Sequence, residues 1–323
     1  MWSITKRAFV CGALALAAGS SFAADYPDHP VKLVIPYGAG GPTDVLGRVL
    51  AESLGRVLKQ PVVVENKAGA AGIVAMTQVS RAKADGYTLL LGDMNLAVSP
   101  ALHRSLAFDP VKDFTPIGMV ATAPMLMLVP SSSPAKTAQE YVAFAKAQSG
   151  KLAYASAGVG SPTHLAAEVF KARYGLEITH VPFQSSGPAL TSVAAGETSL
   201  MFTGLSAAKP LVDSGRLRPL AITGDHRAPE LPNVPTLKEA GIPLPELAVG
   251  SWWGLLAPAG LPPSIASALS HALQAALASP ELKARLTTLN YTQAPAGTDF
   301  RTWVAQEART WGAVMEKAGI RPD

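Results

Sequence analysis

One seven-residue pattern occurs twice in this sequence, and both copies stand in the same local setting. Residues 38–44 read GAGGPTD and residues 158–164 read GVGSPTH, so both follow the pattern Gly-x-Gly-small-Pro-Thr-polar. Each copy follows a short apolar run typical of a strand and precedes a stretch typical of a helix. Glycines allow a sharp turn after the strand, and proline is favoured at the first helical position, where its missing N–H leaves no bond unmade. The repeat therefore predicts two strand–loop–helix units, with Gly41 and Ser161 as helix N-caps.

Strand-like and helix-like segments alternate along the rest of the chain. We expect strands at 31–37, 61–66, 87–93, 125–130, 152–157, 178–183, 199–204, 217–224 and 251–258. We expect helices at 44–59, 73–83, 138–148, 164–175, 189–197, 263–279, 280–289 and 299–319. Short strands that alternate with helices are typical of right-handed βαβ units and a parallel sheet. The pattern restarts near residue 125, which favours two α/β lobes followed by a helical tail.

The first of these lobes is predicted to be discontinuous in sequence. Lobe 1 comprises residues 24–124 and 250–323, because the helical tail is long enough to pack back on the first lobe. Lobe 2 comprises residues 125–249. The apolar segments around Met125 and Trp252 are expected to connect the lobes.

The first 23 residues have the features of a secretory signal peptide. Lys6 and Arg7 precede an apolar segment, AFVCGALALAAG, and the small residues after it place cleavage after Ala23. The only cysteine, Cys11, falls in this segment, so a mature chain without disulfide, thiolate metal site or cysteine nucleophile is expected. An exported protein without cysteines fits a bacterial periplasm better than a disulfide-stapled extracellular module.

The composition favours a globular protein and disfavours two classes of partner. A hydrophobic content of 48% provides ample material for a core. Without the two basic residues of the signal peptide, 25 basic residues (27 − 2) face 23 acidic ones. Because no cluster of Lys and Arg contains interleaved aromatic residues, nucleic acid is not an expected partner. After the signal peptide no apolar run reaches the roughly 18 residues of a transmembrane helix.

The repeated loops predict a binding site for an anion. In open α/β sheets, ligands bind beyond the carboxyl ends of the strands, where these helices begin. Free N–H groups and the positive end of a helix dipole attract anions, and Thr43 and Thr163 add hydroxyl groups. If the lobes face each other, the two loops suit a small molecule with one or two carboxylates. Tyr37 and Phe183 are candidate pocket walls, and Asp44 either complements its own helix dipole or meets an amino group of the ligand.

Three other chemistries fit the sequence less well. A dinucleotide site would use Gly38, Gly40 and the acid Glu65, but Thr43 stands where the third glycine is needed. A serine hydrolase needs Gly-x-Ser-x-Gly, which the segment around Ser161 lacks, so a cap is favoured over a nucleophile. The six histidines show no paired spacing for a metal. The alternative function is therefore an exported α/β enzyme, either a hydrolase or a nucleotide-dependent dehydrogenase.

Several longer motifs resemble one family, the periplasmic solute receptors of tripartite tricarboxylate transporters, often called Bug receptors. The motifs are IPYGAGGPTD, VVVENKAGAAGIVA, ADGYTLLLG, DPVKDFTPIG, YASAGVGSPTHLAAEVF, VPFQSSGPAL, LPNVPTLKEAGI and SWWGLLAPAGLP. The resemblance covers essentially the whole mature chain. It implies a two-lobed type II periplasmic binding protein fold that closes over a small carboxylate. It also implies delivery to a membrane permease without catalysis, and we expect a monomer without a cofactor or metal.

The resemblance also implies which residues contact the ligand. The first loop is expected to contribute Tyr37, Gly40, Gly41, Thr43 and Asp44. The second loop is expected to contribute Ser156, Gly158, Ser161, Thr163 and His164. The segments 93–95, with Asn95, and 183–186, with Phe183, Gln184 and Ser185, are expected to flank the ligand.

Overall fold

The computed structural model describes residues 26–103, 105–295 and 297–317. The predicted signal peptide, residues 1–23, lies outside the described residues. In the part of the chain that is described, no helix is both long enough and apolar enough to cross a membrane.

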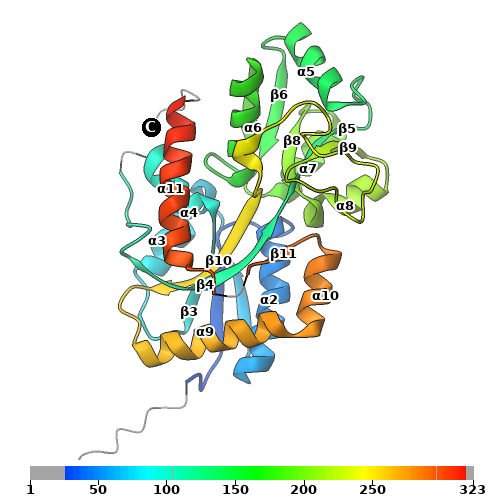
Figure 1. Cartoon of the computed structure of the whole chain (residues 1–323). Helices are drawn as coiled ribbons and strands as arrows, with labels where there is room; N and C mark the ends of the chain where they lie inside the picture. Colours follow the sequence, from blue (N-terminus) through cyan, green and yellow to red (C-terminus); the bar gives the residue numbers. More distant parts are fainter. Residues whose placement is uncertain (1–25, 104, 296, 318–323) are drawn as a thin grey trace, which may run out of the picture.

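Two groups of strands and helices, the lower and upper parts of Figure 1, are joined by two chain crossings. In the first, β4 (Phe114–Ala123) leads almost directly into β5 (Met125–Pro130). In the second, the chain returns from the upper group through β10 (Ser251–Pro258). These crossings coincide with the two connections expected from the sequence, whereas the lobe boundaries as such stay a prediction.

The lower group is built on a six-stranded sheet in the order β11-β4-β10-β3-β1-β2. Its other strands are β1 (Val31–Ile35), β2 (Val62–Asn66), β3 (Thr88–Asp93) and β11 (Thr292–Gln293). β1 pairs in parallel with β2 and β3, but β10 pairs antiparallel with both β3 and β4. The sheet is therefore mixed rather than parallel as predicted, because β10 enters it on the way back from the upper group.

Helices cover both faces of this sheet. One face is covered by α2 (Pro42–Leu58), α9 (Pro263–Ala278) and α10 (Pro280–Thr288). The other is covered by the short turn η1 (Ala70–Gly72), α3 (Ile73–Ser80), α4 (Met94–Leu102) and α11 (Phe300–Lys317). The strands supply apolar side chains to both faces in alternation: Leu89 and Leu91 pack on the α2 side, and Leu90 packs on the α4 side. This double burial explains why β3 reads as a continuous apolar run.

The upper group contains two smaller sets of strands. β5 lies between β8 (Met201–Gly204) and β9 (Leu217–Ile222) and pairs antiparallel with both. β6 (Leu152–Ser156) pairs in parallel with β7 (Ile178–Pro182). The helices of this group are α5 (Ala138–Ala147), α6 (Pro162–Tyr174), α7 (Ser186–Ala195) and α8 (Leu205–Asp213), with a short turn η2 (Pro245–Leu247) before β10. β5 is buried along its whole length, as its apolar sequence predicted.

Three of the helices and strands that the sequence does not predict contain a proline. α4 contains Pro100, α8 contains Pro210, and β4 contains Pro116. Proline normally interrupts helices and strands, so these segments were not assigned. In α4, burial outweighs the tendency of proline to interrupt a helix, since seven of its nine residues are buried. Few polar residues therefore remain in α4 to show a helical period. In β4 the proline lies at a register irregularity opposite Leu256.

Gly250 lies at the point where the two crossings approach each other. It precedes β10, and Ser251 then pairs with Ala123 at the end of β4. Its φ of +72° lies in the left-handed region that favours glycine. A Cβ atom at this position would lie 2.2 Å from the carbonyl oxygen of Ala123. The two crossings therefore touch through backbone atoms, and only glycine fits between them.

Candidate functional site

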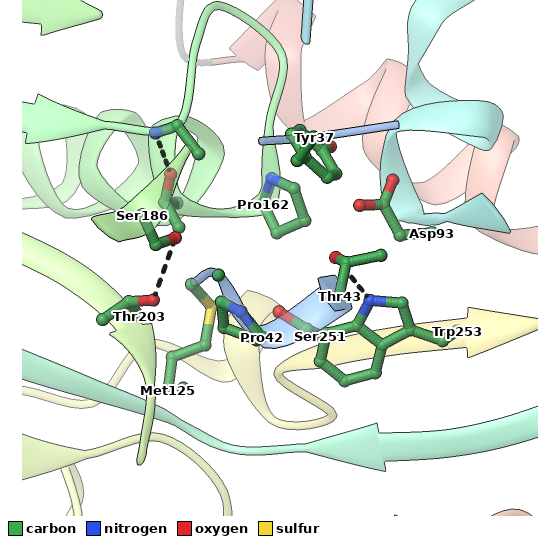
Figure 2. Close-up of a pocket in the computed structure, with 14 residues that line it drawn as sticks. Tyr37, Pro42, Thr43, Asp93, Met125, Pro162, Ser186, Thr203, Ser251 and Trp253 are labelled. Carbon is green, nitrogen blue, oxygen red and sulfur yellow. Dashed lines mark hydrogen bonds between the residues drawn. The ribbon is translucent and has the colours of Figure 1, made fainter. Parts of the chain in front are cut away.

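A buried cavity lies where the two repeated loops meet, shown in Figure 2. Its lining comprises Tyr37, Gly41, Pro42, Thr43, Asp93, Met125, Ala157, Pro162, Thr163, Ser186, Thr203, Gly204, Ser251 and Trp253. The space open to the centre of a water-sized sphere is about 30 Å³. Since roughly 10–15 Å³ of such space holds one water, the cavity matches a group of a few atoms, such as a carboxylate.

Four helices begin at this cavity. α2 starts at Pro42, α6 at Pro162, α7 at Ser186, and α8 directly after Gly204. The N–H groups of a first helical turn have no partner within the helix. In addition, the N-caps of α2, α7 and α8 make no side-chain capping bond. The positive ends of four helix dipoles therefore converge on one small space, which favours an anion.

The hydroxyl groups of the cavity differ in how they are used. Trp253 Nε1 donates to Thr43 Oγ1 at 2.9 Å, and because indole only donates, the proton of Thr43 stays available to a ligand. Thr203 Oγ1 donates to Ser186 Oγ at 3.3 Å, which likewise leaves the proton of Ser186 available. In contrast, Thr163 Oγ1 accepts from the Ala157 N–H at 2.8 Å and lies 2.9 Å from Ser161 Oγ, so it is already engaged by its own loop.

Asp93 brings a carboxyl group to the cavity wall. It ends β3 and caps α4, where its Oδ1 accepts from the Asn95 N–H at 3.0 Å. Its Oδ2 and the Tyr37 hydroxyl are both buried, and the two groups interact with each other. Burial away from water raises the pKa of Asp93 to about 7. Burial also raises the pKa of Tyr37, and the nearby Asp93 carboxylate adds to this shift.

A wider pocket of about 680 Å³ adjoins the cavity and shares Tyr37 and Ala157 with it. The remaining lining residues are Gly69, Ala70, Ala71, His103, Gly158, Val159, Pro182, Phe183, Gln184 and Pro188. Three of the predicted site residues, Gly158, Phe183 and Gln184, thus lie around this outer space rather than around the inner cavity.

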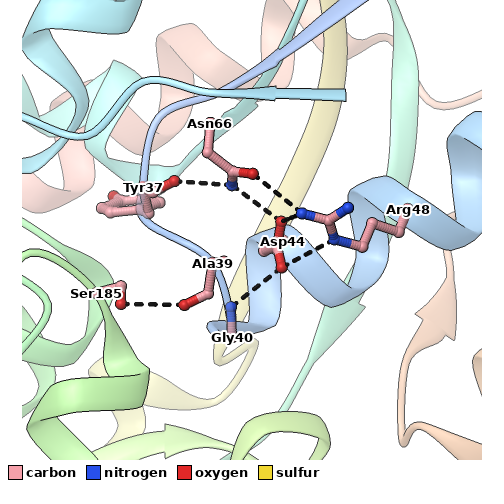
Figure 3. Close-up of polar contacts among 7 residues, drawn as sticks. All are labelled: Tyr37, Ala39, Gly40, Asp44, Arg48, Asn66 and Ser185. Carbon is pink, nitrogen blue, oxygen red and sulfur yellow. Dashed lines mark hydrogen bonds and ion pairs between the residues drawn. The ribbon is translucent and has the colours of Figure 1, made fainter. Parts of the chain in front are cut away.

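Asp44 and Gly40 hold the first loop in shape, as Figure 3 shows. Asp44 accepts hydrogen bonds from the Gly40 N–H at 3.0 Å, Asn66 at 2.9 Å and Arg48 at 3.1 Å. Asn66 also donates to the Tyr37 carbonyl at 3.0 Å. Burial opposes ionisation of Asp44, but its hydrogen bonds outweigh burial and lower its pKa. Asp44 and Gly40 do not line the described cavity, and a ligand contact for either stays a prediction.

Four further predicted residues are buried beside the site and do not line its cavities. Ser161 caps α6, accepting from the His164 N–H at 3.3 Å and donating to the Gly158 carbonyl at 2.7 Å. This use of its hydroxyl fits the cap that the sequence favoured over a nucleophile. His164 Nδ1 accepts from the Gly160 N–H at 3.1 Å. Asn95 donates to the Ala71 carbonyl.

The fourth residue, Ser156, contacts a partly buried pair of histidines, His180 and His164, that their sequence spacing does not reveal. Ser156 Oγ lies 2.6 Å from His180 Nε2, and the rings of His180 and His164 lie 4.4 Å apart. Burial and the neighbouring His164 lower the pKa of His180 to about 4, so it is neutral at pH 7. Among the described residues no three groups of the metal-binding types come together, here or elsewhere. These contacts orient the second loop.

The first loop also touches the segment 183–186 across the site. The Gly38 N–H donates to the Gln184 carbonyl at 3.4 Å, and Ser185 Oγ donates to the Ala39 carbonyl at 3.3 Å. Ser185 therefore joins this segment to the first loop and does not line the cavity. Sequence reasoning did not single out Ser186 or Trp253 as site residues. The signals were present, since Ser186 begins a helix within an expected flanking segment, and Trp253 follows the glycine at the second crossing.

Comparisons with known proteins match nearly the whole chain to one family. A sequence profile described as "Tripartite tricarboxylate transporter family receptor" matches residues 46–320. The chain is 33% identical to Protein BugT of Bordetella pertussis over 325 residues, an alignment that covers 99% of both proteins.

Solved structures agree with this match. The structure of R. palustris Rpa4515 with adipate has a TM-score of 0.87 and 34% identity, covering 92% of this chain and 100% of that one. MatC (Rpa3494) from Rhodopseudomonas palustris with bound malate has a TM-score of 0.84 and 32% identity, covering 90% and 99%. The predicted α/β periplasmic binding protein fold is confirmed. The chain belongs to the tripartite tricarboxylate transporter receptor family, whose Bug members are periplasmic solute receptors and not enzymes.

Proposed function

We propose that this chain is a periplasmic receptor that binds a small organic carboxylate and delivers it to the permease subunits of a tripartite transporter. The observation that supports the ligand class is the convergence of four helix N-termini on one small buried cavity. The adipate and malate in the structures of similar receptors support the same class. The receptor acts as a monomer without a cofactor, after removal of residues 1–23.

Direct hydrogen bonds decide the affinity for the carboxylate. One exposed helix dipole contributes roughly 0.3–1 kcal/mol, whereas a hydrogen bond to a charged group contributes roughly 1.5–3 kcal/mol. Thr43 and Ser186 each have a hydroxyl proton that their neighbours leave unused. We assign these two hydroxyls, with the first-turn N–H groups of α2 and α7, to the ligand carboxylate.

The rest of the ligand extends into the wider pocket. The inner cavity of about 30 Å³ accommodates one polar group, and the adjoining pocket of about 680 Å³ accommodates a longer chain. The passage between them runs past Tyr37 and Ala157, which line both spaces. Phe183 and Gln184 then lie around the distal end, so this end, rather than the carboxylate, distinguishes one ligand from another.

Ligand exchange requires lobe 1 (24–124 and 250–323) and lobe 2 (125–249) to separate. The two polar contacts that join the first loop to the segment 183–186 are long, at 3.4 Å and 3.3 Å, and hydrogen bonds weaken at such distances. Breaking these two costs little. The Ser206 and Tyr291 hydroxyls, one from each lobe, lie 2.8 Å apart and hold the closed state together beside bound ligand.

The experiment that tests this proposal compares each acid with its own amide. Purified mature protein is screened by thermal shift against mono- and dicarboxylates, and each hit is measured by calorimetry beside the corresponding primary amide. The acid is expected to bind at least tenfold more tightly, because only the charged group gains from the helix N-termini. Equal affinities for acid and amide, or no binding by any carboxylate, would contradict the proposal.

A pair of serine variants in α7 provides the matched control. Ser186→Ala removes a hydroxyl from the cavity and is expected to weaken carboxylate binding about tenfold or more. Ser192→Ala removes a buried hydroxyl from the same helix, where Ser192 lies 3.3 Å from Thr198 and does not line the cavity. It is expected to leave affinity unchanged. The proposed role of Ser186 is wrong if both variants bind alike.

A further inference from the structure

The described lining of the wider pocket is uncharged apart from one histidine. None of these lining residues is lysine, arginine, aspartate or glutamate, and only His103 among them can acquire a positive charge. A charged group that leaves water needs an opposite charge or a set of hydrogen bonds to offset its lost hydration. The lining therefore offers little to a second carboxylate, and the end of the ligand that enters this pocket is expected to be uncharged.

Most of this lining is apolar, and part of it is open to solvent. Val159 in the second loop lines the pocket and is 40% exposed. Phe183 is only half-buried, and the lining residues Ala70, Pro182 and Pro188 are exposed. Apolar surface of this kind gains free energy when an apolar group covers it, in proportion to the area removed from water. The pocket therefore favours a ligand with an apolar body.

The wider pocket continues the carboxylate cavity, so one molecule can occupy both. Tyr37 and Ala157 line both spaces. The inner cavity of about 30 Å³ lies at four helix N-termini and suits the charged group. The outer pocket of about 680 Å³ has room for the rest of the molecule. The two spaces together fit a ligand that is charged at one end and apolar at the other.

We propose that this receptor selects monocarboxylates with an extended apolar body, a chain or a ring, over dicarboxylates of the same length. This inference rests on the proposed function, because it names the class of ligand that the same carboxylate site takes. The carboxylate occupies the inner cavity, and the apolar body lies against Val159 and Phe183 in the wider pocket. The ligand therefore differs from adipate and malate, which are present in the structures of two similar receptors and carry two carboxylates each.

Two matched ligand series test the selectivity by calorimetry. The first compares hexanoate with hexanedioate at pH 7 and at pH 8, because histidine usually changes charge between pH 5 and 8. Hexanoate is expected to bind at least tenfold more tightly at both pH values. The second series lengthens the chain from propanoate to hexanoate, and each added CH₂ group is expected to tighten binding about threefold. A dicarboxylate that binds as tightly as its monocarboxylate, or an affinity that does not rise with chain length, would overturn the inference.

Gln184→Lys provides a sharper test, because it adds a cation to the described lining of the wider pocket. Gln184 is exposed and lines this pocket. The ratio of hexanoate affinity to hexanedioate affinity is expected to fall at least tenfold in this variant. Gln139→Lys is the matched control, since it adds the same charge at an exposed position of α5 outside the lining. It is expected to keep the ratio of the unmodified protein, and equal ratios in the two variants would contradict the inference.

Val159→Thr tests the apolar contact itself, since threonine has nearly the shape of valine. The gain in affinity from propanoate to hexanoate is expected to shrink about threefold, because the new hydroxyl loses hydration against the chain. Val63→Thr is the control, since Val63 is 54% exposed on β2 and does not line the pocket. If both variants keep the full gain, the ligand body does not lie against Val159 and the inference fails.

The two proposals fail in different ways. If no carboxylate binds to the unmodified protein, or if acids and their amides bind alike, the proposed function is wrong. If carboxylates bind more tightly than their amides but hexanedioate binds as tightly as hexanoate, only the selectivity for an apolar body is wrong.

Discussion

Thr43→Val is expected to lower both stability and ligand affinity, for separable reasons. Trp253 Nε1 donates to Thr43 Oγ1 at 2.9 Å, and both side chains are buried. Valine has nearly the same shape as threonine, so the indole N–H stays buried but loses its acceptor. A buried donor without a partner costs roughly 1–3 kcal/mol, which is the expected fall in the free energy of unfolding.

The loss of affinity in Thr43→Val comes from the hydroxyl proton rather than from the indole. The hydroxyl is assigned to the ligand carboxylate, and a hydrogen bond to a charged group contributes roughly 1.5–3 kcal/mol. At about 1.4 kcal/mol for each tenfold change, Kd should rise roughly 10- to 150-fold. Calorimetry with the best carboxylate of the screen measures this change directly.

A double-mutant cycle with Trp253→Phe separates the two effects. Urea unfolding of both single variants and the double variant should give a coupling of roughly 1–3 kcal/mol, because the second change costs less once the bond is gone. Thr115→Val is the matched control, since Thr115 donates to the Pro258 carbonyl at 3.1 Å, away from the cavity. It should lower stability without changing affinity. If the losses of unfolding free energy in the two single variants add up to that of the double variant within about 0.5 kcal/mol, the Thr43–Trp253 bond is not a source of stability.

Three further predictions concern the crossing, the buried acid and the cap. Gly250→Ala should destabilise the protein by more than roughly 3 kcal/mol in urea unfolding, since left-handed backbone and a clash with a carbonyl combine. Gly215 has a φ of +69°, but a Cβ atom added there would have no atom within 4 Å, so Gly215→Ala should lower the free energy of unfolding by only about 1 kcal/mol. Equal losses in the two variants would show that the clash at Gly250 contributes nothing. The pKa of Asp93 rises on folding from 3.8 to about 7, so the folded state binds the extra proton and stability falls as pH rises between these values. Relative to Asp93→Asn, the unmodified protein should lose roughly 2 kcal/mol from pH 5 to pH 7, and a pH-independent difference would contradict this. Ser161→Ala should cost about 1 kcal/mol through loss of the α6 cap, measured by urea unfolding, and a neutral result would mean that the cap adds nothing.

Elements with strong local signals were predictable from the sequence. The apolar runs that became β1, β3 and β5 and the two Pro-Thr helix starts were found because each depends on neighbouring residues. The antiparallel insertion of β10 between β3 and β4 was not predicted, because it depends on a pairing between distant segments. The same limit hid α4, which is buried on nearly all sides and therefore lacks a polar face.

The candidate site was predictable in outline but not in the role of each side chain. The repeat located Thr43 and Thr163, yet only Thr43 keeps a free proton, because Trp253 occupies its acceptor. The sequence around Asp44 fits a ligand contact and a structural acid equally well, and it does not reveal the bonds of Asp44 to Arg48 and Asn66. Such roles depend on partners that lie far away in the sequence.

The position of β10 between β3 and β4 affects how the chain folds during synthesis. Trp253 pairs with Asp93 and Ser251 pairs with Ala123. The centre of the lower sheet is therefore complete only after residues 251–258 have been synthesised. Until then β3 and β4 expose unpaired edges, and such long-range pairing is slow to form. If the chain is exported through its signal peptide, as proposed, this delay keeps it unfolded until translocation, and chaperones that bind open strand edges have time to act.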